Sequence, residues 1–257
     1  MRRPGFEPGS SAWQADILTI RLSAPDYLII SASIYINFEG FRIIMYKLVS
    51  FGLGGILIKE DNGWDMIRKK YKIPNLWDSY IDGILTREEA KVGEYILWKL
   101  LGVNRKCLKK DLNRFTLMKG VRQVICVLKR NRITPVIISD NPEHLVRNVA
   151  RKLGIKLVAY DSIIFDKKGY AYDTKPTHPS KDRRVSKLKA LKDFAKKKKV
   201  SLKECIVVGN GSSDMTIFKK AGLSIAFNPK DINSRKGADK SIVSNDLTKI
   251  LKYIVTN

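Results

Sequence analysis

The chain has 257 residues, which is enough for one large domain or two small ones and for a sizeable hydrophobic core. Hydrophobic residues make up 44% of it and charged residues 29%, both ordinary for a soluble globular protein. The 49 lysine and arginine residues outnumber 25 acidic residues, which gives a formal net charge of +24.

This positive charge favours partners that carry phosphate groups, nucleic acids among them. The plainer interpretation is a lysine-rich surface that only faces solvent. The basic runs, such as residues 196–199, contain no interleaved aromatic residues, and the sequence carries no signature of a nucleic-acid-binding module. Nucleic-acid binding therefore enters only as a minor hypothesis.

The cysteine pattern and the apolar stretches exclude further classes. Cys107, Cys126 and Cys205 lie far apart without CxxC spacing, which argues against a zinc site or a disulfide framework and predicts a cytoplasmic protein. The longest apolar stretch, residues 27–38, is about half as long as the ~20 residues of a membrane span. The two arginines at the N-terminus precede no apolar signal core, so we expect neither membrane insertion nor export.

Residues 1–44 differ in composition from the rest of the chain. They hold four basic and four acidic residues, so the whole net charge of +24 lies in residues 45–257. The stretch Gly5-Phe6-Glu7-Pro8 can be encoded by GGG-TTC-GAA-CCC, which resembles the T-arm of a transfer RNA gene. We therefore predict that Met45 is the native start and that residues 1–44 are a non-native or disordered extension. A genuine flexible arm is the alternative.

After Met45, strand and helix patterns alternate along the chain. Thr86, followed three residues later by Glu89, forms a capping box that opens one helix. Asn141 and Pro142 suit the N-cap and the first position of another helix. The elements predicted as far as these residues are a strand at 47–51, a mostly helical stretch at 62–116, a helix at about 120–131 and a strand at 135–138.

The second half of the chain continues the alternation. Its predicted elements are a β-hairpin at 163–172, a basic helix at about 183–199, a strand at 205–208, a helix, a short strand at 223–227 and a C-terminal helix at about 246–254. Short apolar strands separated by helices predict an α/β fold with a parallel sheet covered by helices on both faces. The stretch 62–116 is too long for a single crossover, so we interpret it as a helical cap inserted into a core of residues 45–61 and 117–257.

Three of the predicted strands end in glycine-rich or polar turns, and ligands of open α/β sheets bind at such carboxyl ends. The first turn, residues 52–55, reads GLGG and carries no reactive side chain. The second contains Ser139, and the third runs from Gly209 to Asp214. Lys187 on the basic helix adds a positive charge some 23 residues before Asn210.

This ordered set, together with the stretch VVGNGSSDMTIFKKAGLSIAF at 207–227, resembles the haloacid dehalogenase-like (HAD) hydrolases. The resemblance covers about residues 46–254 and points to the phosphoserine-phosphatase-like branch, with a Rossmann-like core and a helical cap. In that family the first turn reads like FDLDGTL. Its first aspartate attacks phosphorus, and its second is the general acid or base and helps to bind magnesium through its carbonyl.

The family's working groups are missing from the matching positions. The two aspartates correspond to Gly52 and Gly54, and the usual threonine to Ile56. The metal-binding aspartate of the GDGxND motif is Asn210, so that only Asp214 remains of that carboxylate pair. Without a side chain at position 52 no covalent intermediate forms there. Because magnesium prefers charged oxygens, the resemblance with these changes predicts weak magnesium binding or none, and no other cofactor.

The remaining groups favour an anion. The resemblance assigns the phosphate-binding serine to Ser139 and the phosphate-binding lysine to Lys187. Main-chain N–H groups of the turn that ends at Gly55 can form an anion-binding nest. Asp140 opposes this arrangement if its carboxylate points inward. Each residue also has a plainer interpretation on its own: a tight turn, a helix cap, a surface lysine, or a helix-start aspartate at Asp214.

Three functions remain open. The first is a catalytically impaired phosphatase-like protein that binds a phosphorylated small molecule, phosphate or a partner. The second is an active phosphoserine-phosphatase-like phosphoric monoester hydrolase that uses water directly, with Asp214 or an unidentified cap carboxylate as base. The third is a basic protein that binds nucleic acid through its surface. We expect neither His144 nor His178 to be catalytic.

Overall fold

The computed structural model describes residues 34–37 and 42–254, with side chains from Tyr46 onward. The strands β1 (Ile34–Asn37) and β2 (Arg42–Met45) pair antiparallel. Our prediction for residues 1–44 therefore falls largely outside the described residues and stays a prediction. Within the described part of the chain, no helix combines the length and the apolar character that crossing a membrane requires.

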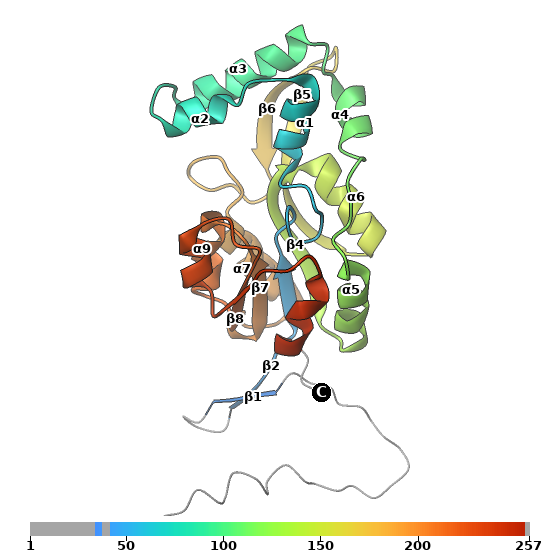
Figure 1. The fold of residues 1–257 in the computed structure, drawn as a ribbon, viewed down its shortest axis with the longest axis vertical. Coiled ribbons are helices and arrows are strands. Elements are labelled where there is room, and N and C mark those ends of the chain that lie inside the picture. Colours follow the sequence, from blue (N-terminus) through green and yellow to red (C-terminus); the bar gives the residue numbers. More distant parts are fainter. Residues whose placement is uncertain (1–33, 38–41, 255–257) are drawn as a thin grey trace, which may run out of the picture. The chain divides into compact units, whose positions relative to one another are not determined.

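A seven-stranded sheet forms the centre of the fold, in the order β6-β5-β4-β3-β7-β8-β9 (Figure 1). All neighbouring strands run parallel except β5 and β6, which form the predicted hairpin. This arrangement confirms the α/β prediction of a mostly parallel sheet. The strand bounds are β3 (Leu48–Phe51), β4 (Thr134–Pro142), β5 (Leu157–Phe165), β6 (Ala171–Pro176), β7 (Cys205–Gly209), β8 (Leu223–Phe227) and β9 (Lys240–Ile242).

Helices bury both faces of the sheet, which explains why its central strands read as continuous apolar runs. Successive residues of a strand point to opposite faces. Accordingly, Val49 and Phe51 belong to one hydrophobic cluster and Leu48, the residue before Val49, to the other. The helices α5 (Val121–Arg130) and α6 (Glu143–Leu153) supply residues to the first cluster, and α7 (Lys187–Lys198) and α8 (Met215–Phe218) to the second.

Between β3 and α5 the chain forms four helices, which we call the helical segment: α1 (Gly63–Tyr71), α2 (Leu76–Ile81), α3 (Arg87–Leu100) and α4 (Arg105–Asp111). They lie at the end of the sheet toward which β3 runs (Figure 1). The predicted capping box is present, since Thr86 accepts from the Glu89 N–H and Glu89 accepts from the Thr86 N–H. Trp98 is fully buried and stacks against Trp64 with 6.2 Å between ring centroids.

Some predicted boundaries were wrong. β4 continues through Asn141 to Pro142, and α6 begins only at Glu143 without a side-chain cap. The reason is tertiary, because the Asn141 side chain accepts a hydrogen bond from the Gly63 N–H instead of capping its own helix. The basic helix begins at Lys187 rather than 183, and the C-terminal helix is a 3-10 helix, Leu247–Tyr253. α9 (Ile232–Gly237) and β9 had not been predicted.

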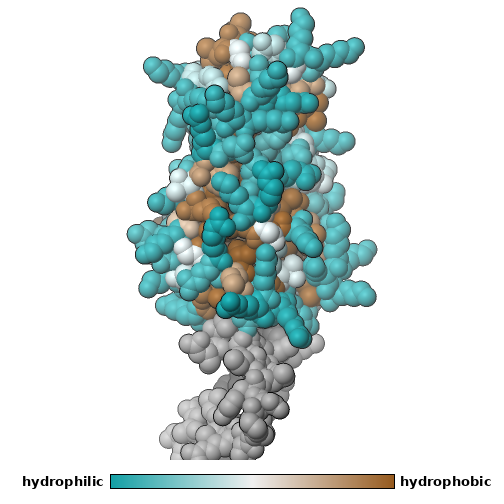
Figure 2. All heavy atoms as spheres, turned by 90° about the vertical axis from the view of Figure 1, so that its right-hand side faces the viewer, coloured by the Kyte–Doolittle hydropathy of each residue, from teal (hydrophilic) through white to brown (hydrophobic). Residues whose placement is uncertain are grey.

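Hydrophilic residues cover most of the face that carries α4, α5 and α6, with apolar residues visible between them (Figure 2). This distribution fits a lysine-rich chain whose long side chains lie over apolar surface.

Candidate functional site

The sheet order brings the three turns singled out in the sequence to one edge. β3 lies between β4 and β7, so the turn at 52–55 and the loop after Gly209 follow the carboxyl ends of two adjacent parallel strands, and Ser139 lies near the carboxyl end of the third, β4. The Gly52 N–H donates to the Val208 carbonyl at 2.9 Å. The Asn210 Nδ2 donates to the Gly54 carbonyl at 2.9 Å, which ties the first turn to the third.

Asp214 and Lys187 form a buried ion pair beside this edge. Lys187 Nζ donates to Asp214 Oδ1 at 2.6 Å and to Ser213 Oγ at 2.8 Å. The other carboxylate oxygen of Asp214 accepts from the N–H groups of Asn210 at 2.9 Å and Gly211 at 3.2 Å. Burial alone would lower the pKa of Lys187, but the charges of Asp214 and Asp140 and the bond to Asp214 outweigh it and raise that pKa. Lys187 is therefore a fixed positive charge.

Ser139 lies at the adjacent strand end, and its side chain is almost fully buried in β4. Its Oγ accepts hydrogen bonds from the Asn141 N–H at 3.2 Å and from Asn141 Nδ2 at 2.9 Å. Two donors therefore orient the hydroxyl, which leaves its own proton for an acceptor such as a phosphate oxygen. Gly55, which has a positive φ of 69°, uses its N–H to donate to the Glu60 carbonyl at 3.0 Å. An anion could take that N–H only if the turn opened.

The space around Gly52 and Gly54 differs between the two positions. A Cβ added at Gly52 would lie 2.9 Å from Cδ1 of Ile56, the far end of a flexible side chain. A Cβ added at Gly54 would lie 1.6 Å from the Asp61 carbonyl oxygen, so the backbone itself occupies that place. The turn accommodates a side chain at position 52 after a small shift, whereas position 54 requires glycine while the Asp61 segment stays where it is.

The nearby acidic side chains are engaged elsewhere. Glu60 accepts from the Thr116 N–H, Asp61 pairs with Lys230 at 3.1 Å, and Asp65 pairs with Arg68. Asp214 pairs with Lys187, and its side chain packs against Gly209. A Cβ added at Gly209 would lie only 2.5 Å from the Asp214 Cγ. These four carboxylates therefore do not fill the space beside Gly52 that the nucleophile of the family would occupy.

A cavity of about 280 Å³ lies between the helical segment and the ends of β4, β5 and β6. This volume is close to the lower end of the ~300–1,000 Å³ range of small-molecule pockets. Asp140, which directly follows Ser139, lines it, so the cavity adjoins the strand-end site. Its other polar and aromatic lining residues include Trp64, Arg68, Trp77, Arg87, Lys91, Glu94, Tyr95 and Asp161.

Asp161 is the strongest candidate functional residue in the cavity, and the sequence analysis missed it. Its side chain is more than nine-tenths buried, and within the described residues its Oδ1 has no hydrogen-bond partner. Burial, followed by the charge of Asp140, raises the pKa of Asp161 to about 7 against the pull of Arg87 and Lys91. The only signal in the sequence is an acidic residue directly after the apolar run 157–160.

Opposite Asp161, the helical segment contributes a second buried acid. Glu94 accepts from Arg68 Nε at 3.1 Å and from Trp77 Nε1 at 2.8 Å. Burial raises the pKa of Glu94 even though Arg68 and Trp77 favour its charged form. The cavity thus presents both signs of charge, which suits a small ligand that carries acidic and basic groups.

A mostly parallel α/β sheet with a helical insertion after β3 is the arrangement of a phosphatase-like hydrolase fold. The family model of haloacid dehalogenase-like hydrolases matches residues 62–222, more than half of the chain. The chain belongs to the haloacid dehalogenase-like hydrolase family, in its phosphoserine-phosphatase-like branch. The matched range begins after the turn at 52–55.

Relatives and solved structures agree on this branch. A phosphoserine phosphatase of Methanocaldococcus jannaschii is 28% identical over 211 residues, which cover 81% of this chain and 97% of that protein. A phosphoserine phosphatase of Campylobacter jejuni is 31% identical over 159 residues, covering 60% and 73%. The structure of a phospho-aspartyl intermediate analogue of phosphoserine phosphatase superposes with a TM-score of 0.68 at 26% identity, covering 81% of this chain and 99% of that one.

The expectation of weak or no magnesium binding was wrong. The chain groups with phosphoserine phosphatases of the HAD family, which depend on Mg²⁺. The candidate ligands of such an ion are the Asn210 amide oxygen, the Gly54 carbonyl, which accepts from Asn210 Nδ2, and the Asp214 carboxylate, which accepts from Lys187 and from the N–H groups of Asn210 and Gly211. Within the described residues, no group of three or more His, Cys, Asp or Glu residues is placed to hold a metal. Mg²⁺ often binds to one or two carboxylates plus substrate phosphate, so this donor set fits an ion held partly by the substrate.

The comparisons also bear on activity and partners. They support an active phosphoric monoester hydrolase at least as well as an impaired one, so the catalytic impairment remains a hypothesis. They point to a phosphorylated small molecule and give no support to a nucleic-acid partner. The cytoplasmic location stays a prediction.

Proposed function

We propose that the protein recognises a small phosphomonoester of the phosphoserine class, with its phosphate at the carboxyl ends of β3, β4 and β7. Lys187 supplies a fixed positive charge there, because Asp214 and Asp140 keep its pKa raised. The Ser139 hydroxyl, oriented by Asn141, supplies a donor. Residues 62–116 act as the cap in this proposal, and residues 45–61 and 117–257 as the core.

The remainder of the ligand lies in the cavity beneath the helical segment. Asp161 offers its unpartnered Oδ1 to a ligand ammonium or hydroxyl group, and Arg87, whose Nε has no hydrogen-bond partner within the described residues, offers positive charge to a ligand carboxylate. Mg²⁺, when bound, would supply positive charge to the phosphate oxygens. Gly54, Asn210 and Asp214 are the residues that would hold the ion, and Lys187 supports the phosphate directly.

The observation that carries the first form of the proposal is the bare first turn. Gly52 has no side chain to attack phosphorus, and the Asp61 backbone lies where a side chain at Gly54 would begin. General acid–base assistance is typically worth ~10²–10⁴-fold in rate. In this form the protein binds the phosphomonoester without passing through an aspartyl-phosphate, and acts as a receptor.

The second form is hydrolysis of the phosphomonoester, and the comparisons favour it. The relatives that cover most of this chain are phosphoserine phosphatases. Without a nucleophilic side chain, water would attack phosphorus directly, and it would need a base within reach. Asp161, with a pKa raised to about 7, has the proton affinity that suits a base near neutral pH.

One experiment tests both forms. The purified chain is titrated with phosphoserine in the presence of Mg²⁺, and both binding heat and released phosphate are measured. Ser139→Ala and Lys187→Gln are expected to weaken binding at least tenfold, while Lys189→Gln, an exposed position on the same helix, serves as the charge-matched control. Binding without phosphate release supports the receptor, and release that both variants suppress supports the hydrolase. Binding unchanged in both variants refutes the proposed site.

A further inference from the structure

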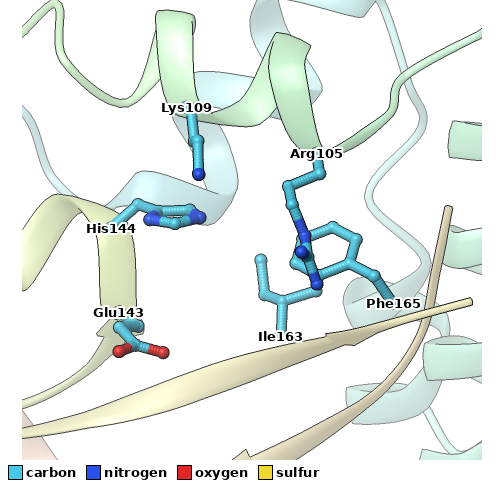
Figure 3. Close-up of a pocket in the computed structure, with 6 residues that line it drawn as sticks. All are labelled: Arg105, Lys109, Glu143, His144, Ile163 and Phe165. Carbon is cyan, nitrogen blue, oxygen red and sulfur yellow. The ribbon is translucent and has the colours of Figure 1, made fainter. Parts of the chain in front are cut away.

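A second pocket lies on another side of the molecule, between the helical segment and the core. It has a volume of about 130 Å³ and is lined by residues of α4, α6 and β5 (Figure 3). α4 is fixed to the hairpin beside it, because the Arg105 N–H donates to the Gly169 carbonyl at 2.8 Å. The lining residues are Arg105, Lys109, Glu143, His144, Ile163 and Phe165.

Basic side chains dominate this pocket. Arg105 and Lys109 are four residues apart on α4 and extend from the same side of the helix toward His144 and Phe165 (Figure 3). Like charges at this spacing destabilise a helix unless something neutralises them. Among the described residues, no salt bridge joins Arg105 or Lys109 to a carboxylate. The one acidic group of the lining, Glu143, is engaged by Arg147 at 2.6 Å.

The surrounding atoms hold these groups in place. The Arg105 guanidinium lies over the Phe165 ring, 4.5 Å from its centroid, which orients its N–H donors. The His144 ring is half-buried between α4 and α6. Burial and then the charge of Lys109 lower its pKa, with smaller contributions from Arg105 and Arg147. The charge of Glu143 opposes this shift. The ionised side chains that line the pocket therefore carry a net positive charge, which an anion would balance.

We propose that this pocket binds free inorganic phosphate through Arg105, Lys109 and His144. A guanidinium and an ammonium are the usual donors to phosphate oxygens. The cavity is well below the ~300 Å³ at which small-molecule pockets begin, so its size suits an anion such as phosphate. Ile163 and Phe165 form an apolar floor that strengthens the attraction of charges above it.

Bound phosphate joins α4 of the helical segment to α6 and β5 of the sheet layer. The site is separate from Lys187 and Ser139 and does not rest on the function proposed above. By linkage, phosphate held against His144 raises the pKa of that ring, and protonation of the ring tightens phosphate binding in return.

The two histidines of the chain allow a direct test by NMR, since His144 reports on the pocket and His178 on a distant loop. Phosphate is titrated into the full chain while the ring signals of both residues are followed. We expect phosphate to shift the His144 signals and raise the pKa of that ring, with the His178 signals unchanged. The double variant Arg105→Gln/Lys109→Gln is expected to weaken this binding at least tenfold.

The control variant is Lys106→Gln/Lys110→Gln, which makes the same change of charge on the same helix at exposed positions outside the lining. It is expected to keep the phosphate-induced shift at His144. Since Arg105 also packs on Phe165, Lys109→Gln alone provides a second variant that leaves this contact in place. Lys187→Gln is expected to leave the His144 titration unchanged. A His144 signal that ignores phosphate, or that responds equally in the two double variants, overturns the proposal.

Discussion

Lys187 Nζ lies 2.6 Å from Asp214 Oδ1, and both side chains are at least nine-tenths buried. This pair links the start of α7 to the loop after β7, two segments that meet at the carboxyl edge of the sheet. The same carboxylate also receives the Asn210 and Gly211 N–H groups, so it organises the loop as well as the lysine.

Removal of this carboxylate is the first test of that view. Asp214→Ala leaves the Lys187 charge buried without a partner, which typically costs about 3–5 kcal/mol. We expect the free energy of unfolding, measured in urea at pH 7, to fall by that order. Asp182→Ala is the matched control, since Asp182 pairs with Arg184 on the surface, where both side chains are more than half exposed. It is expected to change stability by less than ~1 kcal/mol. Equal effects of the two substitutions would show that the buried pair has no special role.

Restoring aspartates to the first turn gives different results at its two positions. Gly52→Asp requires only that the end of Ile56 move, so we expect a folded protein with a change in unfolding free energy below ~1.5 kcal/mol. Gly54→Asp places Cβ against the Asp61 carbonyl and forces the backbone to shift, which we expect to cost more than ~3 kcal/mol. Thermal unfolding of both variants checks this. A Gly54→Asp protein as stable as Gly52→Asp would mean that the Asp61 segment moves freely.

Position 52 also bears on activity. Gly52→Asp is expected to bring phosphate release from phosphoserine with Mg²⁺ above the level of the unmodified chain, because a nucleophile then faces phosphorus. A chain already as active as the variant would establish the hydrolase form of the proposed function and show that water attacks without this side chain.

Local patterns were sufficient to predict much of this fold. The central strands were visible as short apolar runs because both faces of the sheet are covered. The Thr86 capping box is a contact between residues three apart, and it appeared as expected. The turn at 52–55 and the positions of Ser139 and Lys187 were found through the order of motifs along the chain.

The features that the sequence did not reveal depend on contacts between distant residues. Asn141 looked like a helix cap, but the Gly63 N–H, 78 residues away in sequence, binds its side chain and extends β4. The sequence analysis did not single out Asp161, because the cavity around it exists only once the helical segment packs above the sheet. No pattern within one segment could show that its Oδ1 would be left without a partner.

Asp161 also makes stability depend on pH. Its folded pKa of about 7 lies above the ordinary value of 3.8, so the folded protein binds a proton more tightly than the unfolded chain. The stabilising contribution is fully present below about pH 4 and is lost as pH rises through about 7, at up to ~1.4 kcal/mol per pH unit. We expect Asp161→Asn to flatten this part of the curve of unfolding free energy against pH and to be more stable than the unmodified chain at pH 8. Asp182→Asn, on the surface, should leave the curve unchanged; an unchanged curve in Asp161→Asn would place the titration elsewhere.

Asn210 gives a test of the magnesium site that does not require catalysis. Its Nδ2 donates to the Gly54 carbonyl, so Asn210→Asp sets a carboxylate against that oxygen and should lower the free energy of unfolding by ~1–3 kcal/mol in EDTA. The added negative charge also strengthens the donor set for Mg²⁺, and an ion that binds only the folded state stabilises it. We expect Mg²⁺ to raise the melting temperature of this variant by several degrees, and more than that of the unmodified chain. Asn228→Asp is the control, because Asn228 makes a similar bond to the Ser244 carbonyl at 2.8 Å far along the chain. It should lose stability without recovery in Mg²⁺, and recovery in both variants would mean that the ion does not bind at the Gly54 carbonyl.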